Sequence, residues 1–234
     1  MQIAIIPARS GSQRISSKNT KDFLGIPIMG RVITLIKQSE LFDRIVVSTD
    51  SKEIADLAEN YGAEVPFLRP AKLSDNFTDT KSVIAHAIET LAIKTAKVDY
   101  CCIYPTSVLM TQEDLKQSHV LYTEGSWDFV FTAFMMDPSP LRGFEIDIET
   151  GGLIMLHPEY WDFRSQDLPP TYLDAGLLYW GNERSWKSKE PIFGPRSNFL
   201  EIPKNRAVDI NNFEDWVRAE RIYSTQNLQT KDGN

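Results

Sequence analysis

The sequence is poor in cysteine and histidine, the residues that build most disulfide frameworks and zinc sites. Two cysteines and three histidines occur among 234 residues. Cys101 and Cys102 are adjacent, so within a strand they point to opposite faces and cannot form an ordinary disulfide. The histidines show no zinc-type spacing with the cysteines. The sequence therefore predicts neither a disulfide scaffold nor a zinc domain, and it fits a reducing compartment.

Long hydrophobic runs are also lacking. No window reaches the roughly 20 apolar residues that a membrane span needs, and Pro7 and Arg9 interrupt the N-terminal segment before it reaches signal-peptide length. The formal net charge of -7 disfavours nucleic acid or an anionic membrane as a partner. With 42% hydrophobic and 24% charged residues, the chain has a globular composition. We expect a cytoplasmic protein with no nucleic-acid or membrane partner.

The first loop lacks both common glycine-rich nucleotide fingerprints, G-x-x-x-x-G-K-[ST] and G-x-G-x-x-G. It follows an apolar N-terminal strand and combines small residues around Gly11 with cationic side chains. Free backbone N–H groups and cations at a strand end suit a phosphate chain, with Arg9 as a forked donor and Lys18 as a point charge. The alternative is a solvated basic turn, and composition alone does not separate the two interpretations.

Strand-like and helix-like patterns alternate through the first part of the chain. Strand patterns occur at the N-terminus and at 44–50, 64–68, 99–104 and 127–134. Helical spacing covers 28–41 and a segment capped by Asp50 or Ser51. It recurs in a segment after the connection at 69–80, carrying Val83, Ile84, Ala87, Ile88 and Leu91, and in a segment from Thr111 in which Leu115 and Val120 face inward. This order predicts an α/β fold, with a mostly parallel sheet sandwiched by helices and ligands outside the carboxyl ends of its strands. The long polar connection at 69–80 is of a kind that often carries function.

The alternation stops near residue 136. Two short apolar runs flank Thr150-Gly151-Gly152 and predict a hairpin within residues 144–155. We predict an inserted arm at 137–176, an α/β domain formed by 1–136 and 177–224, and a frayed tail at 225–234. Because such an arm buries little of itself, we expect a homodimer in which a second copy covers Trp161, Phe163 and Tyr172.

The segment 207–210 has strand character and precedes a helix whose inward side chains are predicted to be Phe213, Trp216, Val217 and Ile222. Residues two apart in a strand share a face, so Asp209 and Asn211 converge on one point and could hold Mg²⁺. Magnesium commonly takes only one or two protein carboxylates. The alternative, which residue type alone favours, is that Asn211 or Asn212 caps the helix and Asp209 is a solvated acid.

Taken jointly, several motifs resemble the acylneuraminate cytidylyltransferase family over nearly the whole chain, to about Tyr223. They are Ala8-Arg9-Ser10-Gly11-Ser12 with Lys18-Asn19, Ser48-Thr49-Asp50, Arg69-Pro70-Ala71, Tyr104-Pro105-Thr106-Ser107 and Ala207-Val208-Asp209-Ile210. Leu73-Ser74-Asp75-Asn76-Phe77 and Thr171-Tyr172-Leu173-Asp174-Ala175-Gly176 are similar to the pseudaminic acid branch of that family. The resemblance implies a Rossmann-like nucleotidyltransferase fold and a homodimer formed through the arm.

The resemblance also implies a Mg²⁺-dependent reaction between CTP and a nine-carbon α-keto acid sugar, in which the anomeric hydroxyl attacks the α-phosphorus and yields a CMP-sugar and pyrophosphate. Catalytic roles fall to Arg9, Lys18 and Asp209. The implied nucleotide-binding residues are Ala8, Arg9, Ser10, Gly11, Ser12, Gln13, Arg14, Lys18, Asn19 and Arg69. The implied sugar-binding residues are Tyr104, Thr106, Ser107, Asp174 and Tyr179, and the implied metal ligands are Asp209 and Asn211.

Two positions depart from the family pattern, which usually has Lys where Gln13 stands and Asp where Asn211 stands. One triphosphate contact and one metal ligand thus become neutral amides, so we expect reduced metal affinity, with Arg14 replacing the missing cation. Two alternatives stay open at this point. One keeps the reaction and changes the sugar to N-acetylneuraminic or legionaminic acid, and the other is a catalytically silent nucleotide-binding homologue.

Overall fold

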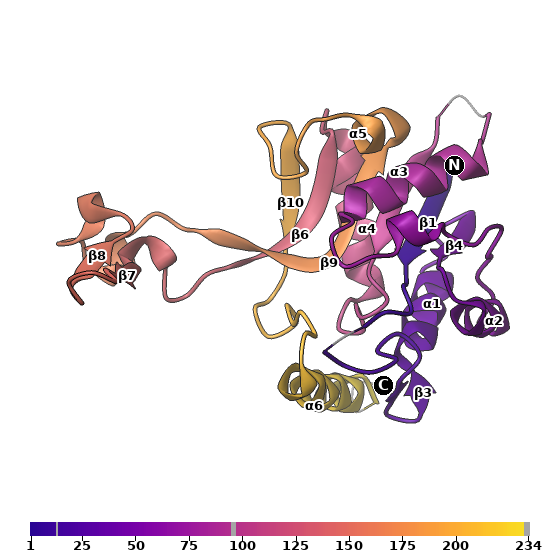
Figure 1. Ribbon diagram of the computed structural model, residues 1–234, viewed down its shortest axis with the longest axis horizontal. Coiled ribbons are helices and arrows are strands. Elements are labelled where there is room, and N and C mark those ends of the chain that lie inside the picture. Colours follow the sequence, from indigo (N-terminus) through magenta and orange to yellow (C-terminus); the bar gives the residue numbers. More distant parts are fainter. Residues whose placement is uncertain (13, 95–96, 232–234) are drawn as a thin grey trace.

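A six-stranded sheet with helices on both faces carries a long arm (Figure 1). This computed structural model describes residues 1–12, 14–94 and 97–231, with side chains to Gln226. The strand order is β10-β6-β9-β5-β1-β4. The predicted α/β sandwich is therefore confirmed.

Parallel pairing joins most of the strands. β1 (Gln2–Pro7) lies between β4 (Arg44–Ser48) and β5 (Asp99–Ile103) and is parallel to both. β10 (Ser197–Glu201) is parallel to β6 (Phe129–Met135). β9 (Tyr172–Asn182), which returns from the arm, is antiparallel to β5 and β6 and fills the space between them. The carboxyl ends of β1, β4 and β5 therefore meet at one edge.

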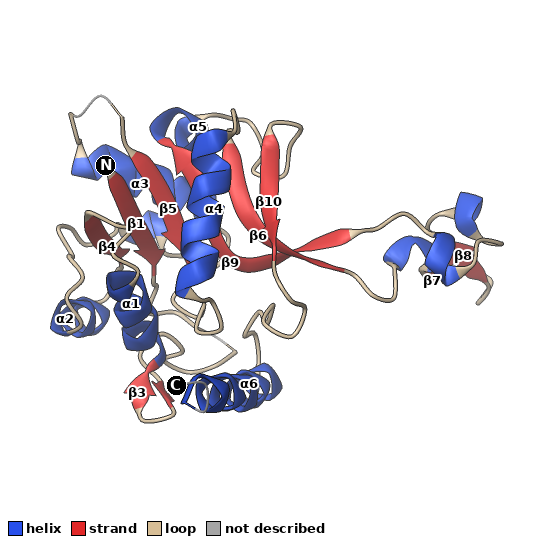
Figure 2. Ribbon diagram, turned by 180° about the vertical axis from the view of Figure 1, so that it is seen from behind, coloured by secondary structure: helices blue, strands red, loops and turns tan. Residues whose placement is uncertain are grey.

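Helices cover the sheet in two groups (Figures 1 and 2). α1 (Ile28–Gln38) and α4 (Gln112–Glu124) pack on one face, while α3 (Thr80–Leu91) and α5 (Glu183–Lys187) pack on the other. α2 (Lys52–Asn60) packs beside α1. Side-chain caps begin four of these helices, because Ser51, Asp79, Thr111 and Asn182 each accept a hydrogen bond from a backbone N–H of the first turn.

The segment after the first loop and the C-terminal helix meet beyond the carboxyl edge of the sheet (Figure 1). β2 (Asp22–Phe23) and β3 (Ile26–Pro27) form a small hairpin whose Phe23 is fully buried. The Phe23 ring packs edge-on against Trp216 of α6 (Phe213–Lys231), with centroids 5.4 Å apart. This contact fixes α6 next to the first loop, although the two segments lie far apart in the sequence.

The arm extends β6 and β9 away from the body (Figure 1). Its tip is the predicted hairpin, formed by β7 (Phe144–Ile146) and β8 (Leu153–Met155) around Gly151, whose φ is +71°. The short 3-10 turns η2 (Pro140–Arg142), η3 (Pro158–Tyr160) and η4 (Ser165–Asp167) complete it, and η1 (Ala71–Leu73) lies in the body. Ile148 is 98% exposed and Trp161 68% exposed. The arm therefore presents apolar surface to solvent.

Several local predictions are wrong. Residues 207–210 form no strand; Val208 and Ile210 are buried as their alternation suggested, but they lie in an irregular segment beside α6. The segment 64–68 contributes only isolated bridges, from Glu64 to Val46 of β4 and from Leu68 to Thr49 just beyond it. α6 continues past residue 225 to Lys231. Within the described residues, no helix is both long and apolar enough to cross a membrane.

Two predicted core positions are exposed. Val120 of α4 is 48% exposed and Phe213 of α6 is 63% exposed. In α4 the buried stripe runs through Leu115, Ser118 and Tyr122 instead. In α6 the buried stripe runs through Trp216 and Ala219. The Val120 error is one of helical phase, since a shift of one residue rotates a side chain by about 100°. Phe213 is instead the first residue of α6.

Candidate active site

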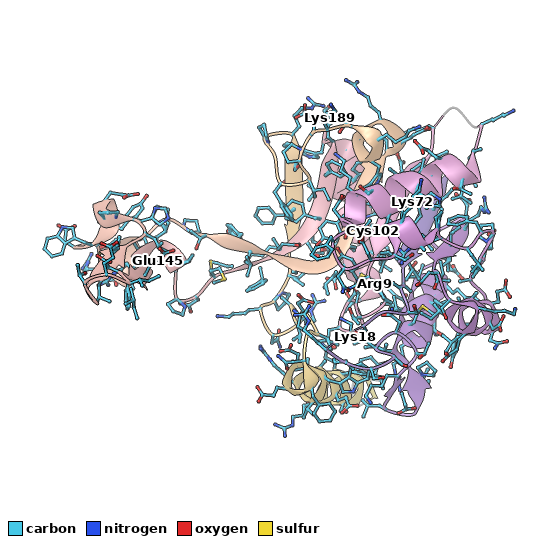
Figure 3. All side chains as sticks on the ribbon, in the orientation of Figure 1. Arg9, Lys18, Lys72, Cys102, Glu145 and Lys189 are labelled. Atoms are coloured by element: carbon cyan, nitrogen blue, oxygen red, sulfur yellow. The ribbon has the colours of Figure 1, made fainter. Side chains whose placement is uncertain are left out.

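A pocket of about 620 Å³ opens at the carboxyl edge of the sheet. Its wall combines the first loop, the connection at 69–80, the turn after β5, the bend in β9 and the segment before α6. Figure 3 shows Arg9 and Lys18 in this region, between the sheet and the C-terminal helix. Twelve of the predicted site residues line the pocket: Arg9, Ser12, Arg14, Lys18, Asn19, Arg69, Tyr104, Thr106, Asp174, Tyr179, Asp209 and Asn211.

A larger hollow of about 860 Å³ lies at the opposite, amino end of the strands. Its wall mixes cations such as Lys97 and Arg184 with the acids Asp99 and Glu183, and it contains none of the predicted site residues. The convergence of predicted residues, rather than size, identifies the smaller pocket as the candidate site.

The first loop is fixed by a carboxylate behind it. The backbone N–H and the hydroxyl of Ser10 donate to the two carboxylate oxygens of Asp50, at 2.9 and 2.8 Å. Burial raises the pKa of Asp50, but the Ser10 hydrogen bonds and the charge of Arg69 outweigh it and leave that pKa lowered. Asp50 therefore stays ionised and holds the loop. Ser10 serves the shape of the loop, since its side chain is turned toward Asp50.

The other predicted loop residues differ in where the structure places them. Ala8 is fully buried, and its N–H donates to the carbonyl oxygen of Ser48 at 2.9 Å. Gly11 is exposed, and a Cβ placed there meets nothing within 4 Å. Gln13 lies outside the described residues. Of the predicted loop residues that the structure describes, Arg9, Ser12, Arg14, Lys18 and Asn19 reach the pocket wall.

Arg9 bridges the first loop to the connection at 69–80. Its Nη1 donates to the carbonyl oxygen of Asp75 at 2.6 Å and to Oδ1 of Asn76 at 2.5 Å. The buried Asn19 donates from Nδ2 to the carbonyl oxygen of Arg9 at 2.9 Å. Asp75 in turn accepts from the N–H and the hydroxyl of Thr78. These connection residues form part of the site, and the length and polarity of the segment were the sequence signal for them.

Arg69 anchors the start of the same connection. It is 5% exposed, and its backbone N–H donates to the carbonyl oxygen of Thr49 at 2.7 Å. Its Nε donates to the hydroxyl of Ser74 at 3.1 Å. Burial lowers the pKa of Arg69, and the negative charge of Asp50 opposes that change. A guanidinium remains charged in such a setting, so Arg69 adds positive potential to the pocket.

Lys18 joins the first loop to the segment before α6. Its Nζ donates to the carbonyl oxygen of Ile210 at 2.8 Å. Burial lowers the pKa of Lys18, and the neighbouring Asp209 carboxylate partly restores it. The cations of the opening loop and the acid near the end of the chain therefore face the same cavity, as the sequence interpretation required.

Asp209 and Asn211 lie side by side on the pocket wall. Asn211 Nδ2 donates to Asp209 Oδ2 at 2.6 Å, so the two side chains do converge, although without a strand. Asn212 is the helix cap, because its Oδ1 accepts the N–H of Asp215 at 3.0 Å. The Asp215 carboxylate accepts the N–H groups of Asn211 and Asn212 and locks the segment.

The opposite wall is aromatic and contains one carboxylate. Tyr179 donates from its hydroxyl to Asp174 Oδ2 at 2.5 Å, and the Tyr104 hydroxyl lies 2.6 Å from that of Thr80. Burial raises the pKa of Asp174 even though the Tyr179 hydrogen bond acts in the opposite direction. Ser107 lies behind this wall, where its hydroxyl donates to the carbonyl oxygen of Leu177. Its visible role is to hold the turn after β5.

The oxygen donors at Asp209 and Asn211 fit a hard cation such as Mg²⁺. Among the described residues, no group of three or more His, Cys, Asp or Glu side chains is placed to hold a metal. One carboxylate and one amide oxygen are a sparse set, but Mg²⁺ usually completes its octahedron with water and phosphate oxygens. Arg9, Arg14 and Lys18 line the same pocket as Asp209 and Asn211.

Comparisons with known sequences agree with this geometry. A family model described as cytidylyltransferase matches residues 3–137. A pseudaminic acid cytidylyltransferase of Campylobacter jejuni is 36% identical, over 94% of this chain and 95% of its own. A CMP-N,N'-diacetyllegionaminic acid synthase of Legionella pneumophila is 30% identical, over 94% of this chain and 95% of its own. An N-acylneuraminate cytidylyltransferase of Escherichia coli is 28% identical, over 98% of this chain and 54% of its own.

Two solved structures share the fold. A CMP:2-keto-3-deoxy-manno-octonic acid synthetase complexed with CTP superimposes with a TM-score of 0.70 at 10% identity, covering 96% of this chain and 99% of its own. The 4-diphosphocytidyl-2C-methyl-D-erythritol synthase of Anaerococcus prevotii gives a TM-score of 0.65 at 12% identity, with 95% and 98% covered. The predicted nucleotidyltransferase fold is therefore confirmed.

Proposed function

The chain belongs to the cytidylyltransferase family, and we propose that it activates a nonulosonic acid, pseudaminic acid in the first place, by transfer of CMP from CTP. The anomeric hydroxyl of the sugar attacks the α-phosphorus, the bond to the β-phosphate breaks, and pyrophosphate leaves. The observation that carries the proposal is the pocket in which Arg9 and Lys18 face Asp209.

Positive charge in the first loop suits the triphosphate. Arg9, Arg14 and Lys18 lie where the negative charge of the leaving pyrophosphate develops, and fixed cations in a partly buried site stabilise that charge. Because Asp50 and Asn19 already hold the loop, little reorganisation accompanies the reaction. Asn19 and Arg69 take the cytidine side of the pocket.

We assign Mg²⁺ to Asp209 and Asn211. When bound, the ion would neutralise phosphate charge next to the reacting phosphorus. Asn211 contributes to this site in two ways, as a neutral oxygen ligand and as the amide that orients Asp209.

The sugar occupies the wall formed by Tyr104, Thr106, Asp174 and Tyr179. The exposed apolar side chains of the arm support a homodimer, because a second copy would remove them from water. We place the protein in the cytoplasm, where the thiols of Cys101 and Cys102, both free in the structure, remain reduced.

Pyrophosphate release tests the proposal. Purified protein is mixed with CTP and Mg²⁺ and with pseudaminic, N-acetylneuraminic or legionaminic acid, singly and in competition. We expect release with pseudaminic acid to be fastest, and Asp209→Ala to reduce it to background. Preferential use of another of the three acids would revise the sugar, and no release above the Asp209→Ala control with any acid would overturn the function.

A nucleotide-binding protein without catalysis is the second candidate, and the neutral Asn211 beside Asp209 is the observation that favours it. It predicts CTP binding by calorimetry without turnover, and activity gained in Gln13→Lys/Asn211→Asp. Turnover by the unmodified chain excludes this candidate.

A further inference from the structure

Asp174 occupies an irregular point of β9 that directs its side chain into the pocket. Pairing with β6 shifts register here, because Tyr179 opposes Phe131 whereas Asp174 opposes Ala133. The extra residues bend the strand, and Gly176 within the bend has a φ of +64°. Bulges commonly redirect a side chain next to a functional site. Asp174 and Gly176 both line the pocket as a result.

The carboxylate of Asp174 is held in position and still has capacity to accept. Oδ2 accepts the hydroxyl of Tyr179 at 2.5 Å, and Oδ1 accepts the N–H of Gly176 at 3.0 Å. A carboxylate offers about four acceptor sites, so each oxygen keeps a free lone pair. Two donors on one carboxylate fix its direction, which is the condition that proton transfer to a positioned group requires.

Transfer of CMP to a hydroxyl requires a group that accepts the hydroxyl proton. Among the described residues that line the pocket, the titratable groups are Arg9, Arg14, Lys18, Arg69, Asp75, Tyr104, Asp174, Tyr179 and Asp209. Guanidinium groups do not lose their protons in proteins, and Lys18 Nζ is engaged as a donor to the Ile210 carbonyl oxygen. Burial raises the pKa of Tyr104 and of Tyr179, so both hydroxyls keep their protons at neutral pH. Three carboxylates remain as acceptors.

Two of these carboxylates are unsuited to the task. Asp209 is assigned to the metal. Asp75 is exposed, and its carboxylate is engaged by the hydroxyl of Thr78 and by the N–H groups of Thr78 and Phe77, which lower its pKa and weaken it as a base. Asn211 has no basic group. Asp174 is half-buried on the sugar side, where burial strengthens its basicity.

We propose that Asp174 is the general base that removes the proton of the anomeric hydroxyl as the sugar oxygen attacks the α-phosphorus of CTP. This inference rests on the proposed function. The proton passes to a carboxylate oxygen of Asp174, and the sugar oxygen forms its bond to phosphorus with the electron pair that it retains. The bond between the α-phosphorus and the oxygen that bridges it to the β-phosphorus breaks. Pyrophosphate leaves with the electron pair of that broken bond.

The surroundings of Asp174 define how its titration responds to substitution. Tyr179 and the Gly176 N–H face it from its own strand, Cys102 and Tyr104 face it from β5 and the turn that follows, and Asp209 faces it across the pocket. The Tyr179 hydroxyl stabilises the ionised form and lowers the pKa of Asp174, whereas the Asp209 charge raises it. Removing the phenol hydroxyl must therefore move the titration of Asp174 to higher pH.

Substitution kinetics test the assignment. Asp174→Asn keeps the size of the side chain and one acceptor oxygen but cannot take a proton. We expect kcat to fall about 10²- to 10⁴-fold, the usual contribution of a general base, with CTP binding by calorimetry unchanged. The acidic limb of the pH profile of kcat/KM should disappear. In Tyr179→Phe the acidic limb should move to higher pH. Asp75→Asn is the control, because it removes the same charge from the same pocket, and in this variant the acidic limb should persist.

Two results would overturn the assignment. One is an Asp174→Asn enzyme whose kcat stays within about threefold of the wild type, or whose loss lies only in the KM for the sugar, which would make Asp174 a binding residue. The other is measured without turnover, by carbon NMR of the Asp174 carboxyl during a pH titration. The titration midpoint of that carboxyl should lie above the ordinary aspartate value of about 4. A midpoint at or below that value would exclude Asp174 as the base. Absence of wild-type turnover with any of the three sugars would instead refute the proposed function.

Discussion

The ammonium of Lys18 lies 2.8 Å from the carbonyl oxygen of Ile210, which is 192 residues later in the chain. This hydrogen bond joins the loop that carries the cations to the segment that carries Asp209. This contact adds to the Phe23–Trp216 packing that holds the two segments together, and the same ammonium adds positive charge to the pocket. Substitutions at Lys18 should accordingly affect nucleotide binding and metal dependence together.

We expect Lys18→Met to lower kcat/KM for CTP by about 10- to 100-fold, because a hydrogen bond to a charged group contributes roughly 1.5–3 kcal/mol. Initial rates across a CTP series, at two Mg²⁺ concentrations, measure the loss. Lys72→Met is the matched control, since Lys72 is exposed in η1 at the edge of the same connection. Equal losses in the two variants would mean that only general positive charge matters.

The pH dependence of CTP binding should also report Lys18. Burial lowers its pKa, so the ammonium loses its proton at a lower pH than an ordinary lysine, whose pKa is about 10.4. Binding should therefore weaken on the alkaline side before that value is reached. Lys18→Arg should remove this loss, because a guanidinium stays charged. Calorimetric titrations with CTP at increasing pH make the comparison, and identical alkaline profiles would contradict it.

Asn211→Asp should strengthen metal binding by adding a carboxylate beside Asp209. We expect the half-saturating Mg²⁺ concentration to fall about tenfold, which corresponds to roughly 1.4 kcal/mol. Asn212→Asp adds the same charge one residue later and keeps a capping oxygen, so it should change that concentration little. A fall of the same size in both variants would show that the effect is one of overall charge.

The arm should determine the oligomeric state. Replacing the exposed Ile148 and Trp161 by Asp is expected to convert a dimer to a monomer, because charged groups are costly to bury in an apolar interface. Sedimentation velocity at several concentrations measures the change. Phe213→Asp, at a position of similar exposure on α6, should leave the dimer intact. A monomeric wild type at micromolar concentration would exclude the dimer.

Arg206 ties the segment before α6 to helix α4. It forms a two-pronged ion pair with Asp114 of α4, in which the side chains are 14% and 7% exposed. Arg206→Met should lower the free energy of unfolding by about 3–5 kcal/mol, because Asp114 is left buried without a cation. Arg196→Met breaks the exposed pair with Asp128 and should have a much smaller effect. Urea unfolding curves compare the two, and similar losses would be contrary to this expectation.

Local patterns in the sequence were sufficient to predict most helices and strands. Thr111 begins α4 with the capping box that its spacing with Asp114 allows, and the hairpin around Gly151 forms where the turn residues stand. The cations of the first loop and Asp209 also meet as expected. These features depend on near neighbours or on strand ends, which sequence patterns describe well.

Features that depend on distant partners were not predictable. The direction of β9 is set by its return from the arm between two existing strands, and no local signal encodes that. Ser10 turns toward Asp50, 40 residues away, and Asn76 reaches Arg9, 67 residues away. At 207–210 the buried alternation was real, but a strand also needs a neighbour for its backbone hydrogen bonds.

β9 runs without interruption from the base of the arm at Tyr172, past Asp174, to Asn182 at the far side of the sheet. Pairing with β6 holds β9 at Tyr172–Asp174, and pairing with β5 and β6 holds it again from Leu178 onward, beyond the bulge. Tyr172, at the base of the arm, is two residues from Asp174 along β9. A displacement of the arm would therefore reach the pocket wall through two residues of β9.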